Sequence, residues 1–384
     1  MGAMASPAAE RPCPDPPSGF LAGLYTFQWC EFNLRLPLVS TLAVAVCLFA
    51  GVLAGHPGAG LIAGGGAFTV GFGANQRIAD SRLIPMIAGI LATSSAAFAG
   101  TVAGHRDYWM LVAAAGSAAI YGILSTRNAG VAWVGQQAFV FMIVATAFPT
   151  GLHGGLNRAA LVAAGGIVQL LFTSAGLRLM PGLRKDIFTL ATSVLSHVYE
   201  EDWAITRRLR NLPSFLPTLS RHEAFGYSLR LVLTSLAATE LYRRLGIQSG
   251  YWIPMTALLV QRPEAMDTVT RATARIVGTV AGAWLGSLFI AHVAPRPEIL
   301  AAITAIFALL ALATNAVNYG LFTACLTGYI VFLLSLNEIP GSVIAHRRMG
   351  CTALGGLIAI AFHADALLRL RRSESRQRSE ERAA

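Results

Sequence analysis

Two arginines four positions apart, Arg271 and Arg275, stand in a largely apolar part of the chain. Residues at this spacing share one face of a helix, so both guanidinium groups can act on a single ligand. A guanidinium group keeps its charge when it leaves water and binds a carboxylate through two parallel hydrogen bonds. A similarly placed arginine, Arg82, precedes an apolar run in the first half of the chain. These residues predict a binding site for organic anions.

Both arginine positions follow an apolar segment that is unusually short or rich in glycine. In the second half the run 250–261 stops before Pro263, at about half the length that a bilayer-crossing helix needs. Its counterpart in the first half, 57–73, is interrupted by glycines. Short or broken segments at corresponding places are typical of transporter binding sites, because exposed backbone inside a membrane must line a cavity or be buried. We therefore expect Arg82 and Arg275 at the start of the next span, where a helix N-terminus adds positive potential.

Four more side chains of the short run could line a path for such a ligand, by ring stacking or hydrogen bonding: Tyr251, Trp252, Thr256 and Gln261. A Tyr-Trp pair at a span end is also typical of the membrane interface, and threonine or glutamine can join one helix to another. For the arginines, the alternative is anchoring at the cytoplasmic surface through their long side chains.

Glu240 is the carboxylate placed deepest in a predicted span, which makes it a candidate proton-coupling residue. Arg243 and Arg244 follow at helical spacing, so a local ion pair is the alternative. The sequence contains no nucleotide-binding loop, metal-spaced histidine and cysteine set or nucleophile motif. We expect no enzymatic activity, no catalytic residue, no metal and no cofactor.

The composition places these residues in a membrane protein. Hydrophobic residues make up 55% of the 384 residues and charged residues 12%, whereas a soluble domain has about a quarter charged residues. The apolar blocks are continuous, which favours helices over a barrel. The net charge of +10 comes from arginines beside the apolar blocks. That distribution indicates membrane topology and argues against nucleic-acid binding.

The chain is predicted to be an all-α polytopic membrane protein of about twelve transmembrane helices. They form two parallel six-helix repeats with short broken second helices, because segments match between the halves at a nearly constant offset. The matches are 33–36 with 228–231, 82–89 with 275–282, and 128–130 with 318–320. The predicted spans are 36–54, 57–73, 83–103, 108–125, 130–148, 158–178, 228–246, 250–261, 274–293, 297–314, 318–336 and 349–367.

The expected organisation has five parts: a cytoplasmic segment 1–30, a first repeat 31–178, a cytoplasmic linker 179–226, a second repeat 227–368 and a basic disordered tail 369–384. Most arginines fall on one side if both termini are cytoplasmic, as the positive-inside rule requires. In that arrangement Arg158, at the start of a predicted span, and Arg347 and Arg348, in an outer loop, lie on the outer side of the membrane. A homodimer is possible.

The stretch 250–286 resembles the hallmark of the fusaric acid resistance family, which includes the aromatic acid exporters of bacterial inner membranes. The residues that carry the resemblance are Tyr251, Trp252, Thr256, Pro263, Arg275, Gly278, Thr279 and Gly282. The aluminium-activated malate transporters of plants, which are anion channels, look similar over the same stretch. The first half keeps Arg82 and Gly89 but has no counterpart of the Tyr-Trp pair or of Pro263.

The resemblance implies an inner-membrane exporter of organic, above all aromatic, carboxylates that is driven by an ion gradient. An anion channel is the first alternative, and a non-transporting assembly or interaction protein is the second.

Overall fold

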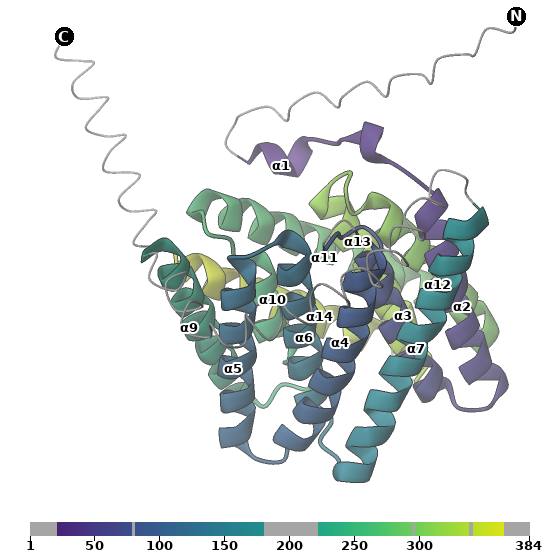
Figure 1. Ribbon diagram of the computed structural model, residues 1–384, viewed down its shortest axis with the longest axis horizontal. Coiled ribbons are helices and arrows are strands. Elements are labelled where there is room, and N and C mark those ends of the chain that lie inside the picture. Colours follow the sequence, from purple (N-terminus) through teal and green to yellow (C-terminus); the bar gives the residue numbers. More distant parts are fainter. Residues whose placement is uncertain (1–20, 79–80, 180–221, 294–295, 338–340, 365–384) are drawn as a thin grey trace, which may run out of the picture.

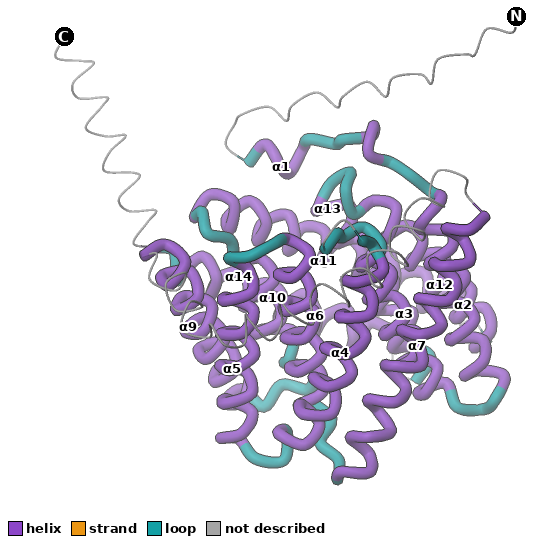
Figure 2. Tube along the Cα trace, in the orientation of Figure 1, coloured by secondary structure: helices purple, strands orange, loops and turns teal. Residues whose placement is uncertain are grey.

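The computed structural model describes residues 21–78, 81–179, 222–293, 296–337 and 341–364. The named secondary-structure elements in these ranges are all helices, and most of them stand side by side in one bundle (Figure 1). Short loops join the helices at the two ends of the bundle (Figure 2). The predicted all-α fold class is confirmed. The tail, most of the linker and the first twenty residues lie outside the described ranges.

The first half begins with the short helix α1 (Ala22–Tyr25) and a 3-10 turn at Trp29–Glu31. Six longer helices follow: α2 (Arg35–Leu53), α3 (Pro57–Gly73), α4 (Leu83–Ala103), α5 (Asp107–Ser125), α6 (Ala129–Thr146) and α7 (Leu152–Leu179). The second half contains α9 (His222–Leu245), α10 (Trp252–Val260), α11 (Ala265–Val293), α12 (Pro297–Thr314), α13 (Tyr319–Ser335) and α14 (Gly341–Ala361).

Each predicted apolar run coincides with one of these helices, but four helices start earlier than the runs suggested. α7 starts at Leu152. α9 starts at His222, which lies inside the stretch assigned to the linker. α11 starts at Ala265 and α14 at Gly341. The first turns of these helices contain polar residues, so apolar composition alone marks their starts too late. Within the described ranges, seven helices are long and apolar enough to cross a membrane.

The second helices of the two halves differ from the expectation of a matched, broken pair. α10 is short, with nine residues, as predicted. α3, in contrast, is a continuous helix of 17 residues. Its glycines allow close packing, since a Cβ at Gly60 would meet the backbone of Gly51 and a Cβ at Gly66 the backbone of Val162.

Helices at equivalent places in the two halves have equivalent neighbours. The second helix of each half packs on the first and the sixth: α3 on α2 and α7, and α10 on α9 and α14. The third helix of each half packs on the fifth and the sixth: α4 on α6 and α7, and α11 on α13 and α14. Between the halves, α5 packs on α9 and α12 on α2. These reciprocal contacts are those expected of two repeats related by a pseudo-two-fold axis. They support the predicted parallel repeat, while the number of helices that cross the membrane stays a prediction.

Glycines and asparagines determine how several of these helices pack and begin. A Cβ at Gly278 or Gly282 in α11 would collide with the backbone of α13, so these glycines allow the two helices to touch. Asn128 and Asn318 cap α6 and α13, each accepting a hydrogen bond from a backbone N–H of the first turn. The same cap at the same helix of each half is a further sign of the repeat.

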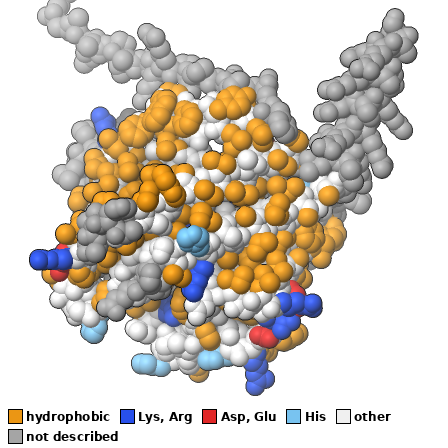
Figure 3. Space-filling model, turned by 180° about the vertical axis from the view of Figure 1, so that it is seen from behind, with side chains coloured by type: hydrophobic (Ala, Val, Ile, Leu, Met, Phe, Trp, Pro, Cys, Tyr) orange, Lys and Arg blue, Asp and Glu red, His pale blue; other side chains and the backbone are white. Residues whose placement is uncertain are grey.

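The outer surface carries many large apolar side chains. Leu91, Trp284 and Leu42 are all more than half exposed. Figure 3 shows hydrophobic side chains spread over most of one face, with arginines, acidic residues and histidines gathered mainly toward its lower rim and sides. Lipid tails can cover such a surface and water cannot do so without cost. The chain is a multi-pass membrane protein.

Candidate functional site

A cavity of about 650 Å³ lies between helices of both halves. α3, α6 and α13 line it along nearly their whole lengths, and α7, α10 and α11 contribute two or three side chains each. On α13 the lining runs from Tyr319 to Asn337 just beyond its end, which corresponds to about 27 Å at the rise of an α-helix. The hydrocarbon core of a bilayer is about 30 Å thick. The cavity therefore extends through most of the depth of the bundle.

The contacts between α3 and α13 show that this wall is continuous. Phe72 meets Phe322 edge-on with ring centroids 5.7 Å apart, and Phe68 stacks on Tyr329 at 4.2 Å. At the far end Gly58 lies beside the Asn337 side chain. Because the two helices run antiparallel, these pairs follow one another along the cavity.

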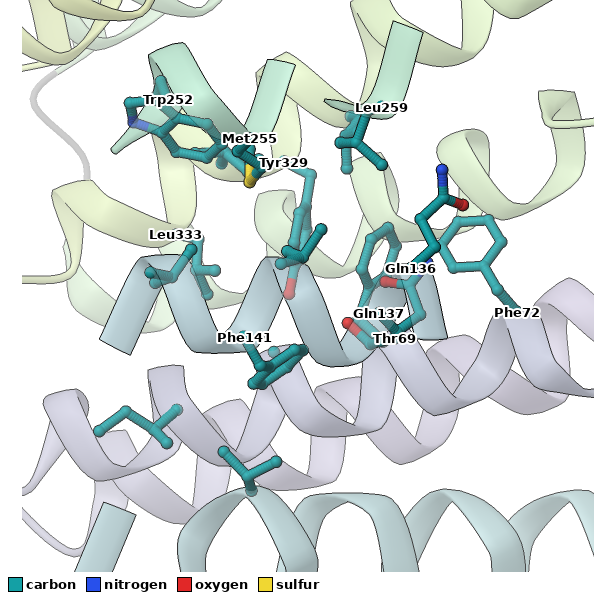
Figure 4. Close-up of a pocket in the computed structure, with 18 of the residues that line it drawn as sticks. Thr69, Phe72, Gln136, Gln137, Phe141, Trp252, Met255, Leu259, Tyr329 and Leu333 are labelled. Carbon is teal, nitrogen blue, oxygen red and sulfur yellow. The ribbon is translucent and has the colours of Figure 1, made fainter. Parts of the chain in front are cut away.

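The lining is aromatic and polar, with positive charge as its ionic component. Figure 4 shows Gln136, Gln137, Thr69, Phe141 and Tyr329 around the same space. Three arginines contribute to the lining: Arg158, Arg271 and Arg275. Among the described residues that line the cavity, none is acidic. The cavity thus combines apolar walls with a few convergent polar groups, as ligand sites commonly do.

Arg271, Arg275 and Tyr319 form a cluster at one end of the cavity. Nη1 of Arg275 donates a hydrogen bond to the Tyr319 hydroxyl at 3.0 Å. The guanidinium carbon of Arg271 lies 3.9 Å from the centroid of the same ring. Tyr319 therefore holds both guanidinium groups, one at its hydroxyl and one at its face.

The cluster leaves donors without a partner. Arg275 is 3% exposed, and the Nε atoms of both arginines have no hydrogen-bond partner within the described part of the chain. The ion pairs found there involve Asp107, Glu240, Arg243 and Arg244, and not these arginines. A buried guanidinium without a carboxylate partner is costly, so the cluster is suited to receive an anion.

Arg275 is not at a helix N-terminus, contrary to the expectation. α11 begins at Ala265, ten residues earlier, because the polar stretch before Arg275 continues the helix. Thr268 stabilises this added start, since its hydroxyl donates to the carbonyl of Glu264 and accepts from the N–H of Arg262. The positive potential at Arg275 thus comes from the two side chains and not from the helix end.

Arg82 occupies the expected place at the start of α4, where it is the N-cap residue. It is half-buried and does not line the cavity. The expected pair of sites, with Arg82 and Arg275 facing each other, is therefore absent from the described cavity. The two helices differ in where they begin relative to the arginine. α11 begins ten residues before Arg275, so that both Arg271 and Arg275 lie within the helix alongside α13, whereas α4 begins directly after Arg82.

The Tyr-Trp pair is buried inside the protein, with Tyr251 4% and Trp252 6% exposed. Interfacial belt residues face lipid, so their burial does not fit the belt alternative. Trp252 lines the cavity (Figure 4), and Tyr251 packs behind it with ring centroids 5.1 Å apart. Of the pair, only the indole is placed to touch a ligand in the cavity.

Thr256 and Gln261 are buried but do not line the cavity. Thr256 packs against Gly355 of α14. Gln261 ends α10, and its backbone carbonyl accepts a hydrogen bond from Tyr227 of α9 at 3.3 Å. Both residues lie in helix contacts and away from the cavity wall, and the Thr256 hydroxyl and the Gln261 side-chain amide have no hydrogen-bond partner among the described residues.

Glu240 lies away from the cavity, near the end of α9. Its Oε1 atom is 2.7 Å from Arg243 and 2.6 Å from Arg244, and Arg243 also pairs with Asp107 of α5 at 2.9 Å. These contacts correspond to the local ion pair that the spacing allowed. No group of His, Cys, Asp and Glu among the described residues is placed to hold a metal ion.

Several cavity residues were missed from the sequence. Gln136 and Gln137 belong to no recognised motif, and Arg158 was expected on the outer side of the membrane, at the start of a span. Arg348 was placed in an outer loop, whereas it lies in α14 and is 1% exposed. The sequence does contain a signal for these two arginines. Each stands seven residues before a Gly-Gly pair, and the two positions are 190 residues apart, the same separation as between the matching segments 128–130 and 318–320.

The comparison with known protein families concerns the half that carries Trp252, Arg271 and Arg275. Residues 235–362 match the family described as fusaric acid resistance protein-like. The resemblance predicted from the motif is confirmed over this fusaric acid resistance-like region, which extends from within α9 to the end of α14. This match and the apolar helices both indicate a membrane protein.

Two uncharacterised bacterial proteins are similar to parts of the chain. One, from Neisseria gonorrhoeae, is 30% identical over 166 residues, which is 42% of this chain and 37% of that protein. The other, from Synechocystis, is 23% identical over 150 residues, 39% of this chain and 19% of that protein. The matches thus span much less than two thirds of these relatives. No solved structure matches the chain.

Proposed function

We propose that the protein transports organic anions, in particular aromatic carboxylates, out of the cytoplasm across a bacterial inner membrane. The proposal rests mainly on the cluster of Arg271 and Arg275 at one end of an aromatic cavity. Their Nε donors are unpartnered among the described residues, and a carboxylate would satisfy them. The fusaric acid resistance-like region contains both arginines.

The walls of the cavity suit the ring of such a substrate. Phe72, Phe322 and Tyr329 present aromatic surface beyond the arginine cluster. Aromatic rings pack edge-to-face or offset on one another, which adds affinity beyond the burial of apolar area. A carboxylate held at Arg275 places the attached ring toward these side chains.

An ion gradient supplies the energy in this proposal, and both termini are cytoplasmic. An anion channel is the second candidate, because the lining follows α13 from Tyr319 to Asn337, through most of the depth of the bundle. A channel conducts down the electrochemical gradient, whereas a coupled exporter saturates and follows the driving ion.

The test is benzoate flux from proteoliposomes, with and without a proton gradient, at clamped voltage. Arg275→Ala is expected to abolish flux, because the carboxylate loses its main partner, while the protein still inserts and purifies normally. Arg77→Ala removes an exposed arginine after the end of α3 and serves as the matched control. Flux in Arg275→Ala at the wild-type rate would contradict the proposed site.

The same assay separates the alternatives. Flux that depends on the proton gradient supports a coupled exporter, and flux that follows voltage alone supports a channel. No flux of benzoate or of any other carboxylate in the wild type would favour the non-transporting role.

A further inference from the structure

Arg348 of α14 is a buried cation that the proposed site does not use. It is 1% exposed, and its guanidinium carbon lies 4.0 Å from the centroid of the Trp252 ring. Nε donates a hydrogen bond to the Thr327 hydroxyl at 3.3 Å, and Nη1 has no partner among the described residues. No acidic residue of the described chain pairs with it. An ionisable group buried at membrane depth is retained for a function more often than for stability.

Arg158 of α7 is the equivalent of Arg348 in the first half. Each arginine lies about two turns after the start of the last helix of its half. Gly165 follows Arg158 by seven residues, and Gly355 follows Arg348 by seven residues. A Cβ at Gly165 would meet the Ala63 carbonyl, and one at Gly355 the Ile253 carbonyl, again at the same offset. The two arginines are thus equivalent in packing as well as in sequence.

A row of three aromatic rings connects these arginines across the interface between the halves. Arg158 lies over the Phe148 ring at 5.3 Å, and Arg348 lies over Trp252. Between them, the ring of Tyr251 is 6.1 Å from that of Phe148 and 5.1 Å from that of Trp252. Phe148, Trp252 and Arg158 all line the cavity. We call these five residues the arginine–aromatic row.

The row is separate from the cluster at Arg275. Gly356 of α14 lies beside Ile276 and Ala272 of α11, so it marks the level of Arg275. Arg348 precedes Gly356 by eight residues, which corresponds to about 12 Å along the helix.

Arg158 and Phe148 lie farther still from Arg275. The cavity lining follows α6 from Trp133 to Phe148, about 22 Å at the helical rise, and Trp133 lies beside Gly73 at the end of α3 that meets Phe322. One small carboxylate cannot reach both Arg275 and Arg158, whereas a cavity of about 650 Å³ has room for two.

We propose that the arginine–aromatic row is a second binding site for the transported aromatic carboxylate, farther along the cavity than Arg275. The carboxylate binds the guanidinium group of Arg158, and the ring packs on Phe148 and Trp252, which line the cavity beside it. Arg348 lies against the Trp252 ring and positions it. This inference rests on the proposed function, since it assigns a second place on the same path. Tyr251 is a positioning residue that holds the two rings which face the ligand.

The present contacts of Arg158 leave it available for such a ligand. Its Nη1 atom donates to the Phe148 carbonyl at 2.8 Å and to the Thr101 hydroxyl at 2.9 Å. These bonds fix the side chain at the cavity wall through one nitrogen only, and a guanidinium group has five N–H donors. A purely structural role of Arg158 would rest on these bonds and on a longer third one, from Nη1 to the Ala145 carbonyl at 3.5 Å, so substitution of Arg158 is the test.

The first experiment counts bound benzoate on the purified full-length chain by equilibrium dialysis. The wild type is expected to bind two benzoate ions per chain, and Arg158→Met or Arg348→Met to weaken one of the two sites about tenfold or more. Arg106→Met is the matched control, because Arg106 is an exposed arginine in the loop next to Thr101. Two unchanged sites in both variants would overturn the proposal.

Thermal unfolding distinguishes a binding role from a structural one. If Arg348 is retained for the ligand, Arg348→Met leaves the melting temperature of the empty protein unchanged or higher, because a buried unpaired charge is removed. The same variant shows a smaller rise in melting temperature when benzoate is added. A lower melting temperature with an unchanged benzoate effect would show that Arg348 is structural.

The outcome also separates this inference from the proposed function. Wild-type flux that is lost in Arg275→Ala but unchanged in Arg158→Met and Arg348→Met removes the second site alone. No benzoate binding and no flux in the wild type removes both.

Discussion

Tyr319 shows how one side chain can organise two cations. Its ring faces Arg271 and its hydroxyl accepts from Arg275, so neither guanidinium group depends on an acidic partner for its position. An acidic partner would neutralise the arginines and compete with a bound anion. An aromatic hydroxyl positions them and leaves their charge for a ligand.

Substitution of Tyr319 should separate these two contacts. Tyr319→Phe keeps the ring beneath Arg271 and removes the acceptor of Arg275, so the KM for benzoate flux is expected to rise about fivefold. Tyr319→Leu removes both contacts and should raise the KM further. Tyr108→Phe, which changes a tyrosine that is 69% exposed, is the control and should leave the KM unchanged. Equal KM values for all three variants and the wild type would remove Tyr319 from the site.

At this scale the sequence identified the two arginines of the cluster, but it missed Tyr319 and the separate buried arginine, Arg348. Arg271 and Arg275 were recognisable because two cations at helical spacing rarely occur in an apolar segment without a role. Arg348 was not, because a buried arginine and a loop arginine next to a span have the same sequence context. Tyr319 follows a helix cap and looks like an ordinary start of a span.

At the scale of helices, contact between α11 and α13 depends on glycine. A Cβ at Gly282 would collide with the Ala324 carbonyl, and backbone cannot move aside as a flexible side chain can. The close contact keeps Arg275 within hydrogen-bond distance of Tyr319. The helix pair therefore determines the geometry of the cluster as directly as the arginines do.

Gly282→Ala is accordingly expected to destabilise the protein by about 1–3 kcal/mol, because it overpacks the contact between α11 and α13. Gly350→Ala is the control, since a Cβ there meets no atom within 4 Å in α14 and alanine favours a helix. Thermal unfolding in detergent measures both. A melting temperature for Gly282→Ala equal to that of Gly350→Ala would contradict the packing argument.

Helix existence was predictable from the sequence, and helix starts were less so. Every apolar run corresponds to a helix, because backbone groups in a membrane have to be satisfied within the segment. The first turns of α11 and α14 were missed because they contain threonine, serine and charged residues. Polar side chains in these two helices are buried and hydrogen-bonded. Thr268 accepts a hydrogen bond from the loop residue Arg262, and Arg348 donates one to Thr327 of α13.

At the scale of the whole molecule, the repeat is more regular in packing than in composition. The helix contacts of one half correspond to those of the other, yet the arginine cluster belongs to the second half alone. The sequence matches predicted the repeat, but they could not predict that only one of the two equivalent arginine positions reaches the cavity. That difference arises from the added turns of α11.

The orientation expected from the arginine distribution can be tested directly. In a background without native cysteines, Tyr108→Cys is expected to react with a membrane-impermeant maleimide in intact spheroplasts. Arg77→Cys should react only after the membrane is opened, because the α3–α4 loop is expected to face the cytoplasm. Both positions are exposed in the structure. The reverse labelling pattern would invert the proposed topology.

The three arginines that line the cavity have an electrical consequence. Arginine stays protonated throughout the physiological pH range, so an anion that passes these groups carries its own negative charge across the bilayer. In a bacterium whose interior is negative, each monovalent anion that leaves gains about 2.3 kcal/mol for every 100 mV of membrane potential. Departure is then electrically downhill and entry uphill, so in the proposed transport the membrane potential favours export in addition to any coupled ion gradient.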